Sequence, residues 1–197
     1  MKNSYGLGEI LSNIISLVYT KVFYKGARFI RRPIYVRGKR YLTYGKGFST
    51  GYGCRLEMFD TGKGSLEKIL IGENCKIGDY VHIAAGEKVT IGSNCLLASK
   101  IFITDISHGN YTDFDMNSTP DIAPDQRPLQ TSKVSIGKNV WIGENVTILP
   151  GVNIGDGVVI GANAVVNKNI PANSIAVGCP AKVVKIFNKD ENKWMKL

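Results

Sequence analysis

The sequence predicts an all-β fold, a parallel β-helix, and three observations lead to it. Between residues 136 and 170 a large aliphatic residue recurs at every sixth position without a slip. A second, smaller apolar residue follows four positions later, and glycine directly follows most of the large ones. An α-helix would repeat apolar residues every three or four positions and a flat strand every second one. A strict period of six instead indicates a chain that turns a corner in each repeat and closes a triangular coil in about eighteen residues.

The repeat can be followed through most of the chain. The large inward positions of the regular stretch are Ile136, Ile142, Ile148, Ile154, Ile160 and Val166, and the smaller ones are Val140, Val146, Val152, Val158, Ala164 and Ile170. Earlier repeats begin at Tyr44, Thr50, Leu56, Ile71, Ile77, Ile83, Ile91, Leu97 and Ile103. Two extra residues before Ile91 shift the register, so Ile71 and Ile91 take equivalent corners and Cys75 should stack on Cys95. We expect the repeated glycines to adopt backbone angles that other residues avoid.

The N-terminal segment, residues 1–41, differs from the coil in charge and pattern. Residues 1–45 carry nine basic side chains and one acidic side chain, or +8 of the net +9 of the chain. Apolar residues at helical spacing over 6–30 predict one or two amphipathic helices that end before Pro33. Such a helix could cap the open end of the coil, and its basic face could also contact an anionic membrane surface.

A β-helix domain is predicted over residues 42–180, with an inserted loop at 105–133. The loop lacks the repeat and contains Pro120, Pro124 and Pro128 among acidic residues. A long insertion in a compact domain is usually functional. The tail, residues 181–197, has apolar Ile186, Phe187 and Trp194 and is predicted to form a short C-terminal helix.

Composition narrows the class of protein. The four cysteines (Cys54, Cys75, Cys95 and Cys179) show no metal-binding spacing, and the first three occupy inward positions, so core packing is expected and no metal site. No secretory signal and no bilayer-spanning stretch is evident, which predicts a cytoplasmic protein. Basic charge confined to one terminal segment, without a recognisable nucleic-acid module, argues against a nucleic-acid partner.

The first candidate for chemistry is His108, one of only two histidines in the chain. It stands at the root of the insertion and is followed by a glycine, so it can project from the coil wall beneath the loop. His82 closes an ordinary repeat, where a surface or stacking role is expected. No pairing of a nucleophile with a base is visible in the sequence, and the isolated Cys179 is a weak candidate for covalent catalysis.

Three stretches carry a resemblance to a known family. They are Val140-Trp141-Ile142-Gly143, the run from Ile148-Leu149-Pro150-Gly151 to Ile160-Gly161-Ala162, and Val177-Gly178-Cys179-Pro180-Ala181-Lys182. Together they resemble the hexapeptide acyltransferases, and within these the galactoside and maltose O-acetyltransferase group, which includes enzymes that acetylate lipopolysaccharide and capsule sugars. The resemblance spans residues 42–187. It implies a left-handed β-helix, a homotrimer with three active sites between neighbouring chains, and acetyl-CoA as cosubstrate.

The resemblance also implies site residues. His108 matches the family's catalytic base, and Asp105 could orient its imidazole, although a backbone carbonyl could do the same. The positions that match the coenzyme A site are Trp141, Gly143, Gly161, Ala162, Lys168, Lys182 and Lys185. Glu144 stands where related enzymes often have serine, so a hydroxyl donor to the oxyanion is missing there and backbone N–H groups would have to serve.

For the acceptor sugar, polar and aromatic residues of the loop and of the facing coil are candidates: Asp79, Tyr80, His82, Asn110, Tyr111, Asp113 and Arg127. The predicted function is transfer of acetyl from acetyl-CoA to a sugar hydroxyl, in a surface polysaccharide or its precursor, by direct attack in a ternary complex. N-acetylation of an amino sugar is the alternative within the fold. A non-catalytic structural trimer is the alternative from another class.

Overall fold

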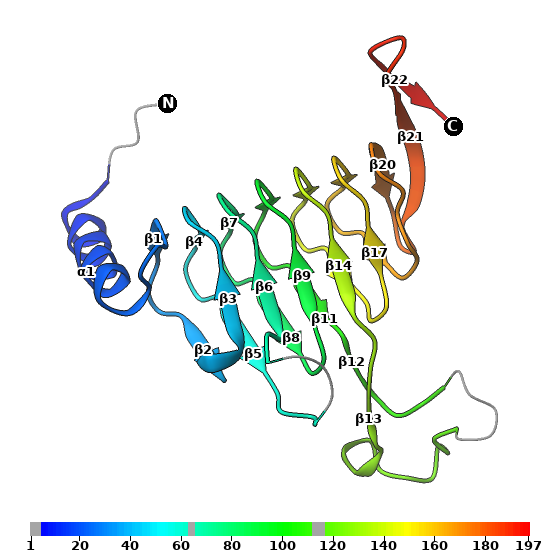
Figure 1. Ribbon diagram of the computed structural model, residues 1–197, viewed down its shortest axis with the longest axis horizontal. Helices are drawn as coiled ribbons and strands as arrows, with labels where there is room; N and C mark the ends of the chain where they lie inside the picture. The colour runs from blue at the N-terminus through cyan, green and yellow to red at the C-terminus, as the bar shows by residue number, and fades with distance from the viewer. Residues whose placement is uncertain (1–4, 63–65, 112–116) are drawn as a thin grey trace.

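The chain forms a triangular prism of parallel β-strands, seen in a computed structural model that describes residues 5–62, 66–111 and 117–197 (Figure 1). Helix α1 (Leu7–Phe23) lies at one end of the prism, and a hairpin of the C-terminal strands lies at the other end. A long insertion leaves the prism from one side (Figure 1). The parallel β-helix predicted from the repeat is therefore confirmed.

Each face of the prism is one sheet. Face A contains β1 (Phe29–Ile30), β4 (Ser49–Thr50), β7 (Lys76–Ile77), β10 (Leu96–Leu97), β15 (Trp141–Ile142), β18 (Val159–Ile160), β20 (Ser174–Val177), β21 (Lys182–Asn188) and β22 (Lys193–Lys196). Face B contains β2 (Tyr35–Arg37), β5 (Arg55–Met58), β8 (His82–Ala85), β11 (Phe102–Thr104), β16 (Thr147–Ile148) and β19 (Val165–Val166). Face C contains β3 (Leu42–Tyr44), β6 (Ile69–Ile71), β9 (Val89–Ile91), β14 (Val134–Ile136) and β17 (Asn153–Ile154). The remaining elements are two short 3-10 helices, η1 (Lys39–Tyr41) and η2 (Pro124–Gln126), and two strands of the insertion, β12 (Ile106–His108) and β13 (Leu129–Thr131).

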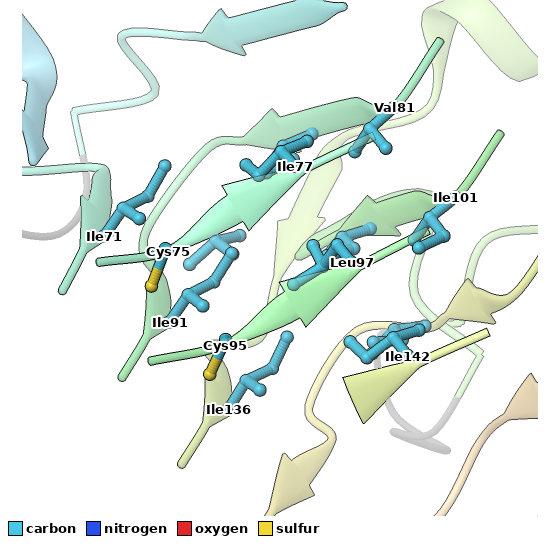
Figure 2. Close-up of a cluster of buried hydrophobic side chains, with 14 of the residues drawn as sticks. Ile71, Cys75, Ile77, Val81, Ile91, Cys95, Leu97, Ile101, Ile136 and Ile142 are labelled. Carbon is cyan, nitrogen blue, oxygen red and sulfur yellow. The ribbon is translucent and has the colours of Figure 1, made fainter. Parts of the chain in front are cut away.

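The inward aliphatic residues stack in columns along the prism axis. Ile71 pairs with Ile91 and Ile91 with Ile136 in the register of face C. Figure 2 shows this column and the thiols of Cys75 and Cys95 one above the other, as the shift in repeat register predicts. These cysteines and Cys54 are buried and unpaired. The core is thus one continuous apolar column, in which each coil covers the next.

The repeated glycines have a different role from the one expected. Gly92 and Gly143 do not adopt positive φ angles; left-handed corners are occupied by asparagine, as at Asn94 and Asn145, and by glycines outside the repeated position, as at Gly151 and Gly157. Asparagine tolerates this conformation better than other residues with a side chain. Glycine is needed instead because successive coils meet closely: a Cβ on Gly143 would lie 2.6 Å from the backbone nitrogen of Ala162.

Replacing one of these glycines should therefore destabilise the coil. A Cβ on Gly92 would lie 2.6 Å from the backbone carbon of Gly137 and the nitrogen of Lys138. Backbone atoms, unlike the end of a flexible side chain, cannot move to another rotamer to relieve the overlap. We expect Gly92→Ala to lower the free energy of unfolding by about 2 kcal/mol, as for overpacked cores. Gly8→Ala, where nothing lies within 4 Å of the new Cβ, is the matched control. Alanine at Gly8 should keep or raise stability, because alanine favours the helix, and a denaturation midpoint of Gly92→Ala equal to that of the wild type would contradict the close-approach explanation.

The coil begins earlier than residue 42. Strand β1 pairs with β4 and β2 pairs with β5, both in parallel, so the first coil starts at Phe29. Ile30, Val36 and Leu42 do follow one another at the repeat distance. The repeat is hard to recognise there because only inward positions must be apolar, and the outward positions between them are rich in arginine.

Helix α1 caps the N-terminal end of the coil, as the sequence suggested. It packs against β1 through hydroxyl side chains: Thr20 Oγ1 accepts a hydrogen bond from the backbone N–H of Ile30 at 2.8 Å. Ser16 Oγ accepts one from Arg32 N–H at 3.2 Å. These bonds satisfy donors that an uncovered first coil would leave without partners. No helix in the described part of the chain is long and apolar enough to cross a lipid bilayer.

The predicted C-terminal helix is wrong. Residues of the tail form the antiparallel strands β21 and β22, which extend face A. Asn188 Oδ1 accepts hydrogen bonds from the backbone of Asp190 and Glu191 and so closes the turn between the strands. Phe187 and Trp194 then pair across the hairpin with ring centroids 5.2 Å apart. The apolar spacing that suggested a helix is a cross-strand aromatic pair.

Candidate active site

The insertion is a hairpin built on two short strands. β12 (Ile106–His108) pairs antiparallel with β13 (Leu129–Thr131), and His108 lies opposite Leu129. The hairpin leaves the coil directly after β11 of face B and returns at β14 of face C. It therefore overhangs the outer side of face B. Asp113, a candidate for the acceptor site, lies outside the described residues.

A cleft of about 780 Å³ runs between this hairpin and face B. Both histidines of the chain contribute to it, although they come from different elements. The other walls are mostly apolar and aromatic, with a few polar groups. The residues that line the cleft are Glu57, Phe59, His82, Ala84, Phe102, Thr104, Ile106, Ser107, His108, Leu129, Leu149, Pro150 and Asn167. An apolar cleft with a few converging polar groups is a typical binding site for a small molecule.

The His108 imidazole is held by the tip of its own hairpin. Nδ1 lies 3.2 Å from the carbonyl oxygen of Pro124. A carbonyl oxygen can only accept, so Nδ1 carries the proton in the neutral ring and Nε2 keeps a lone pair. That tautomer leaves Nε2 able to accept a proton from a hydroxyl group in the cleft.

Two residues predicted to bind the acceptor, Tyr111 and Arg127, form hydrogen bonds that support His108. The Tyr111 hydroxyl donates to the His108 carbonyl at 2.7 Å, and Arg127 Nη1 donates to the same hydroxyl at 2.7 Å. Other nitrogens of the Arg127 guanidinium bond to the carbonyls of Ile122 and Pro120. The two side chains are thus engaged within the loop. Asn110 lies beside Tyr111 in a second hollow behind the hairpin.

Asp105 does not orient His108. Its carboxylate is fully buried at the root of the hairpin and accepts hydrogen bonds from the backbone N–H groups of Gly86, Glu87 and Lys88 at 2.6–2.9 Å. Burial raises the pKa of the Asp105 carboxyl, against the effect of these three donors. The prediction from sequence fails because the side chain turns toward the corner between β8 and β9. The backbone carbonyl of Pro124 takes the orienting role.

Asp105 should therefore matter for stability. Asp105→Ala would leave three backbone donors at one corner without their acceptor, and lost hydrogen bonds to a charged group cost about 1.5–3 kcal/mol each. Water can reach the partly exposed donors, so we expect a total loss of about 3 kcal/mol in the free energy of unfolding. Chemical denaturation measures this loss. A loss of unfolding free energy below a tenth of this value would show that the Asp105 carboxylate does not stabilise the corner.

The far wall of the cleft is a buried carboxylate that sequence analysis missed. Glu57 is only 4% exposed, and its Oε2 accepts from His82 Nε2 at 2.9 Å and from Arg55 Nη2 at 2.6 Å. Burial lowers the pKa of His82, and Arg55 adds to the fall, although the bond to Glu57 opposes it. The neutral ring donates Nε2–H to Glu57 and packs on Phe102, with centroids 5.0 Å apart. His82 is a cleft residue, as its place among the acceptor candidates suggested.

The remaining acceptor candidates, Asp79 and Tyr80, do not line this cleft. They occupy the corner between β7 and β8, where Asp79 Oδ1 accepts from the backbone N–H of Tyr52 at 2.7 Å. Tyr80 packs edge-on against the Tyr52 ring. In the single chain, these two residues stabilise a corner remote from His108.

Most of the predicted cofactor residues lie on another part of the prism. The register of face A places Trp141, Val159, Ile175 and Lys185 in one row across four strands. Lys182 follows in the same hairpin. Gly143, Gly161 and Ala162 form the adjoining corner between faces A and B. Lys168 stands apart from this set and next to Asn167, at the end of the cleft.

The cofactor set presents a surface that suits an extended, amide-rich arm with a phosphate at one end. Trp141 is 52% exposed, so its ring is available for contact rather than buried in packing. Gly161 has no side chain and is half-buried, and Ala162 is exposed with only a methyl group, so the backbone of this corner lies near the surface, whereas Gly143 is buried against the next coil. Lysines on the neighbouring strand β21 supply positive charge for phosphate. Among the described residues, no group of three or more histidine, cysteine or acidic side chains could hold a metal ion.

Comparison with known proteins identifies the family. A family model described as bacterial transferase hexapeptide (six repeats) matches residues 133–168. The chain is 45% identical over 192 residues to WbbJ of Escherichia coli (strain K12), a protein assigned to lipopolysaccharide biosynthesis as an O-acetyltransferase; the match covers 98% of this chain and 95% of that one. The chain therefore belongs to the hexapeptide-repeat acetyltransferases, and it is an acyltransferase.

Solved structures show the same fold at lower identity. One is AntD, an N-acyltransferase from Bacillus cereus, in complex with dTDP and 3-hydroxybutyryl-CoA, with a TM-score of 0.68, 21% identity, and coverage of 97% of this chain and 93% of that chain. Another is a galactoside acetyltransferase in complex with coenzyme A, with a TM-score of 0.51, 21% identity and coverage of 98% and 90%. These likenesses identify the β-helix as the left-handed one of this family.

Proposed function

We propose that the protein transfers the acetyl group of acetyl-CoA to a sugar hydroxyl of lipopolysaccharide, another surface polysaccharide or a precursor of one. The observation that carries this proposal is the bond between His108 Nδ1 and the Pro124 carbonyl, which leaves Nε2 free as a base inside a cleft. The name of the relative from Escherichia coli supports the hydroxyl acceptor and the class of glycan.

In the proposed reaction, His108 acts as a general base. Nε2 takes the hydroxyl proton while the sugar oxygen attacks the thioester carbonyl carbon. A carbon–oxygen bond forms, the carbon–sulfur bond breaks, and the departing thiolate of coenzyme A receives the proton from the imidazolium. Direct transfer is expected because Cys179, the one exposed cysteine among the described residues, has no histidine beside it in the β20–β21 turn to activate it. The apolar wall of Phe102 and Leu149 limits water around the reacting groups.

The placement of the two predicted sets supports a homotrimer. The base lies where face B adjoins face C, whereas the cofactor row lies on face A and its corner with face B. A complete site then needs face A of one chain to stand against the His108 cleft of another. Such a head-to-tail contact closes into a ring when the rotation is right, and a prism with three faces suits a ring of three.

The acetyl donor and the reduced, buried thiols suit a cytoplasmic enzyme. We place it at the inner face of the membrane, where a lipid-linked sugar acceptor would be within reach.

The test is release of coenzyme A from acetyl-CoA in the presence of sugar acceptors. A panel of oligosaccharides with free hydroxyls should support release, and mass spectrometry should detect an alkali-labile acetyl ester. If amino sugars alone support release and the product resists mild alkali, the enzyme is an N-acetyltransferase. If no acceptor in either class supports release although coenzyme A binds, the transferase proposal is wrong.

A further inference from the structure

Helix α1 is amphipathic, but its aliphatic side faces away from the protein and not toward it. Its side toward the coil has no aliphatic residue: Ser16 and Thr20 are fully buried and bond to the backbone of β1 and of the segment that follows it, and Tyr19 packs against the core beside them. In an ordinary surface helix, the apolar side faces the core and the polar side faces water. Here the hydroxyl groups are drawn inward because they satisfy the open edge of the first coil.

The opposite side of α1 is apolar, and no helix or strand in the described part of the chain covers it. Each of its large aliphatic residues is 42–87% exposed. They share one side because a turn takes 3.6 residues, and they are Leu7, Ile10, Leu11, Ile14, Ile15, Leu17, Val18 and Val22. Leaving such side chains in water forgoes roughly 1 kcal/mol or more for each. We call these eight residues the outer face of α1.

Basic residues border the outer face on both sides. Arg28 shares a shallow groove with Ile10 and Ile14, and Arg32 shares one with Leu11 and Ile15. Lys21 and Lys25 add charge at the C-terminal end of the helix. Glu9, the one acidic residue among the first 45, is paired with Arg31 at 3.0 Å.

We propose that the outer face of α1 inserts into the surface of an anionic lipid bilayer, with the helix lying in the plane of the membrane. An apolar stripe bordered by lysine and arginine is the pattern that binds such a surface, through apolar burial together with attraction to acidic headgroups. A second copy of the chain is a poorer occupant because it would bring two cationic borders together. Helix α1 lies at the end of the prism far from β22 (Figure 1), so the proposed contact leaves the coil and its hairpins projecting away from the bilayer.

This inference stands on α1 alone and does not depend on the transferase activity. The experiment is flotation of the full-length protein with vesicles of phosphatidylcholine or of phosphatidylcholine mixed with phosphatidylglycerol. We expect binding to the anionic vesicles and much less to the neutral ones, and weaker binding as salt is added. Changing both Arg28 and Arg32 to glutamine should weaken binding by a factor of about 30, at about 1 kcal/mol per charge.

Substitutions on the outer face separate insertion into lipid from contact with a second copy of the chain. Leu11→Asn together with Val18→Asn should abolish flotation without changing the melting temperature, since both side chains point away from the coil; Leu66→Asn, at a residue 81% exposed outside α1, should have no effect. Val18→Trp should show a blue shift of its fluorescence on addition of anionic vesicles. Failure to bind anionic vesicles at low salt, or binding that survives the asparagine changes, would overturn the proposal. So would a smaller oligomer in the asparagine variant, because α1 would then face another copy.

Discussion

His108→Ala is expected to lower kcat/KM for acetyl transfer by a factor of about 10²–10⁴, the usual contribution of a positioned general base. The substitution removes Nε2 from the cleft and leaves attack to an un-ionised sugar hydroxyl. His108 is exposed, and its ring makes one hydrogen bond to the backbone of the loop, so the melting temperature should stay close to that of the wild type. Initial rates of coenzyme A release with the best acceptor, measured beside a thermal melt, check both parts of this expectation.

Ile122→Ala is the matched control, because Ile122 is a 42% exposed residue of the same insertion and its backbone carbonyl still accepts from Arg127. The control should retain most of the activity. A purely structural trimer predicts that neither variant changes anything measurable. Equal rates in the His108 variant and the control would therefore rule out His108 as the base.

The sequence predicts the coil well because the β-helix constrains it at every repeat. Each inward position must hold an aliphatic residue of suitable size in contact with the coils above and below, so Ile136, Ile142 and Ile148 indicate three faces in order. The prediction of the coil is less accurate where neighbouring residues add a second pattern to the repeat. At Ile30 and Val36, arginines on the outer side obscure the repeat, and in the tail the Phe187–Trp194 pair mimics helical spacing.

The site is only partly predictable, for a physical reason. His108 could be found because a histidine at the root of a polar insertion is unusual, and the structure places it in a cleft of about 780 Å³ that His82 also lines. Glu57 could not be found, because nothing in its repeat distinguishes it from an ordinary outward glutamate. In the structure it is only 4% exposed and is covered by two arginines. Asp105 shows the reverse error: a polar residue near a catalytic candidate was expected to orient it, and its hydrogen bonds instead hold the corner between β8 and β9.

Mixed oligomers provide the strongest test of how the site is assembled. His108→Ala removes the base, and Ala162→Trp places a bulky ring on the exposed corner where the cofactor arm is proposed to lie. Neither variant alone should be active. We expect oligomers that contain both kinds of chain, isolated through two different affinity tags, to recover about one third of the wild-type rate, since a three-membered ring assembled head to tail has one intact site whatever its composition.

The expected recovery follows from the separation of the two sets. In a ring of three, an active site needs an intact base on one chain and an intact cofactor surface on its neighbour. Every mixed ring has one boundary of that kind and two defective ones. If base and cofactor surface belonged to the same chain, each chain would carry one defect and mixing would restore nothing. Recovery therefore distinguishes a site shared between face A and the His108 cleft of neighbouring chains from a site complete within one chain, and a sedimentation mass of a single chain would exclude the shared site directly.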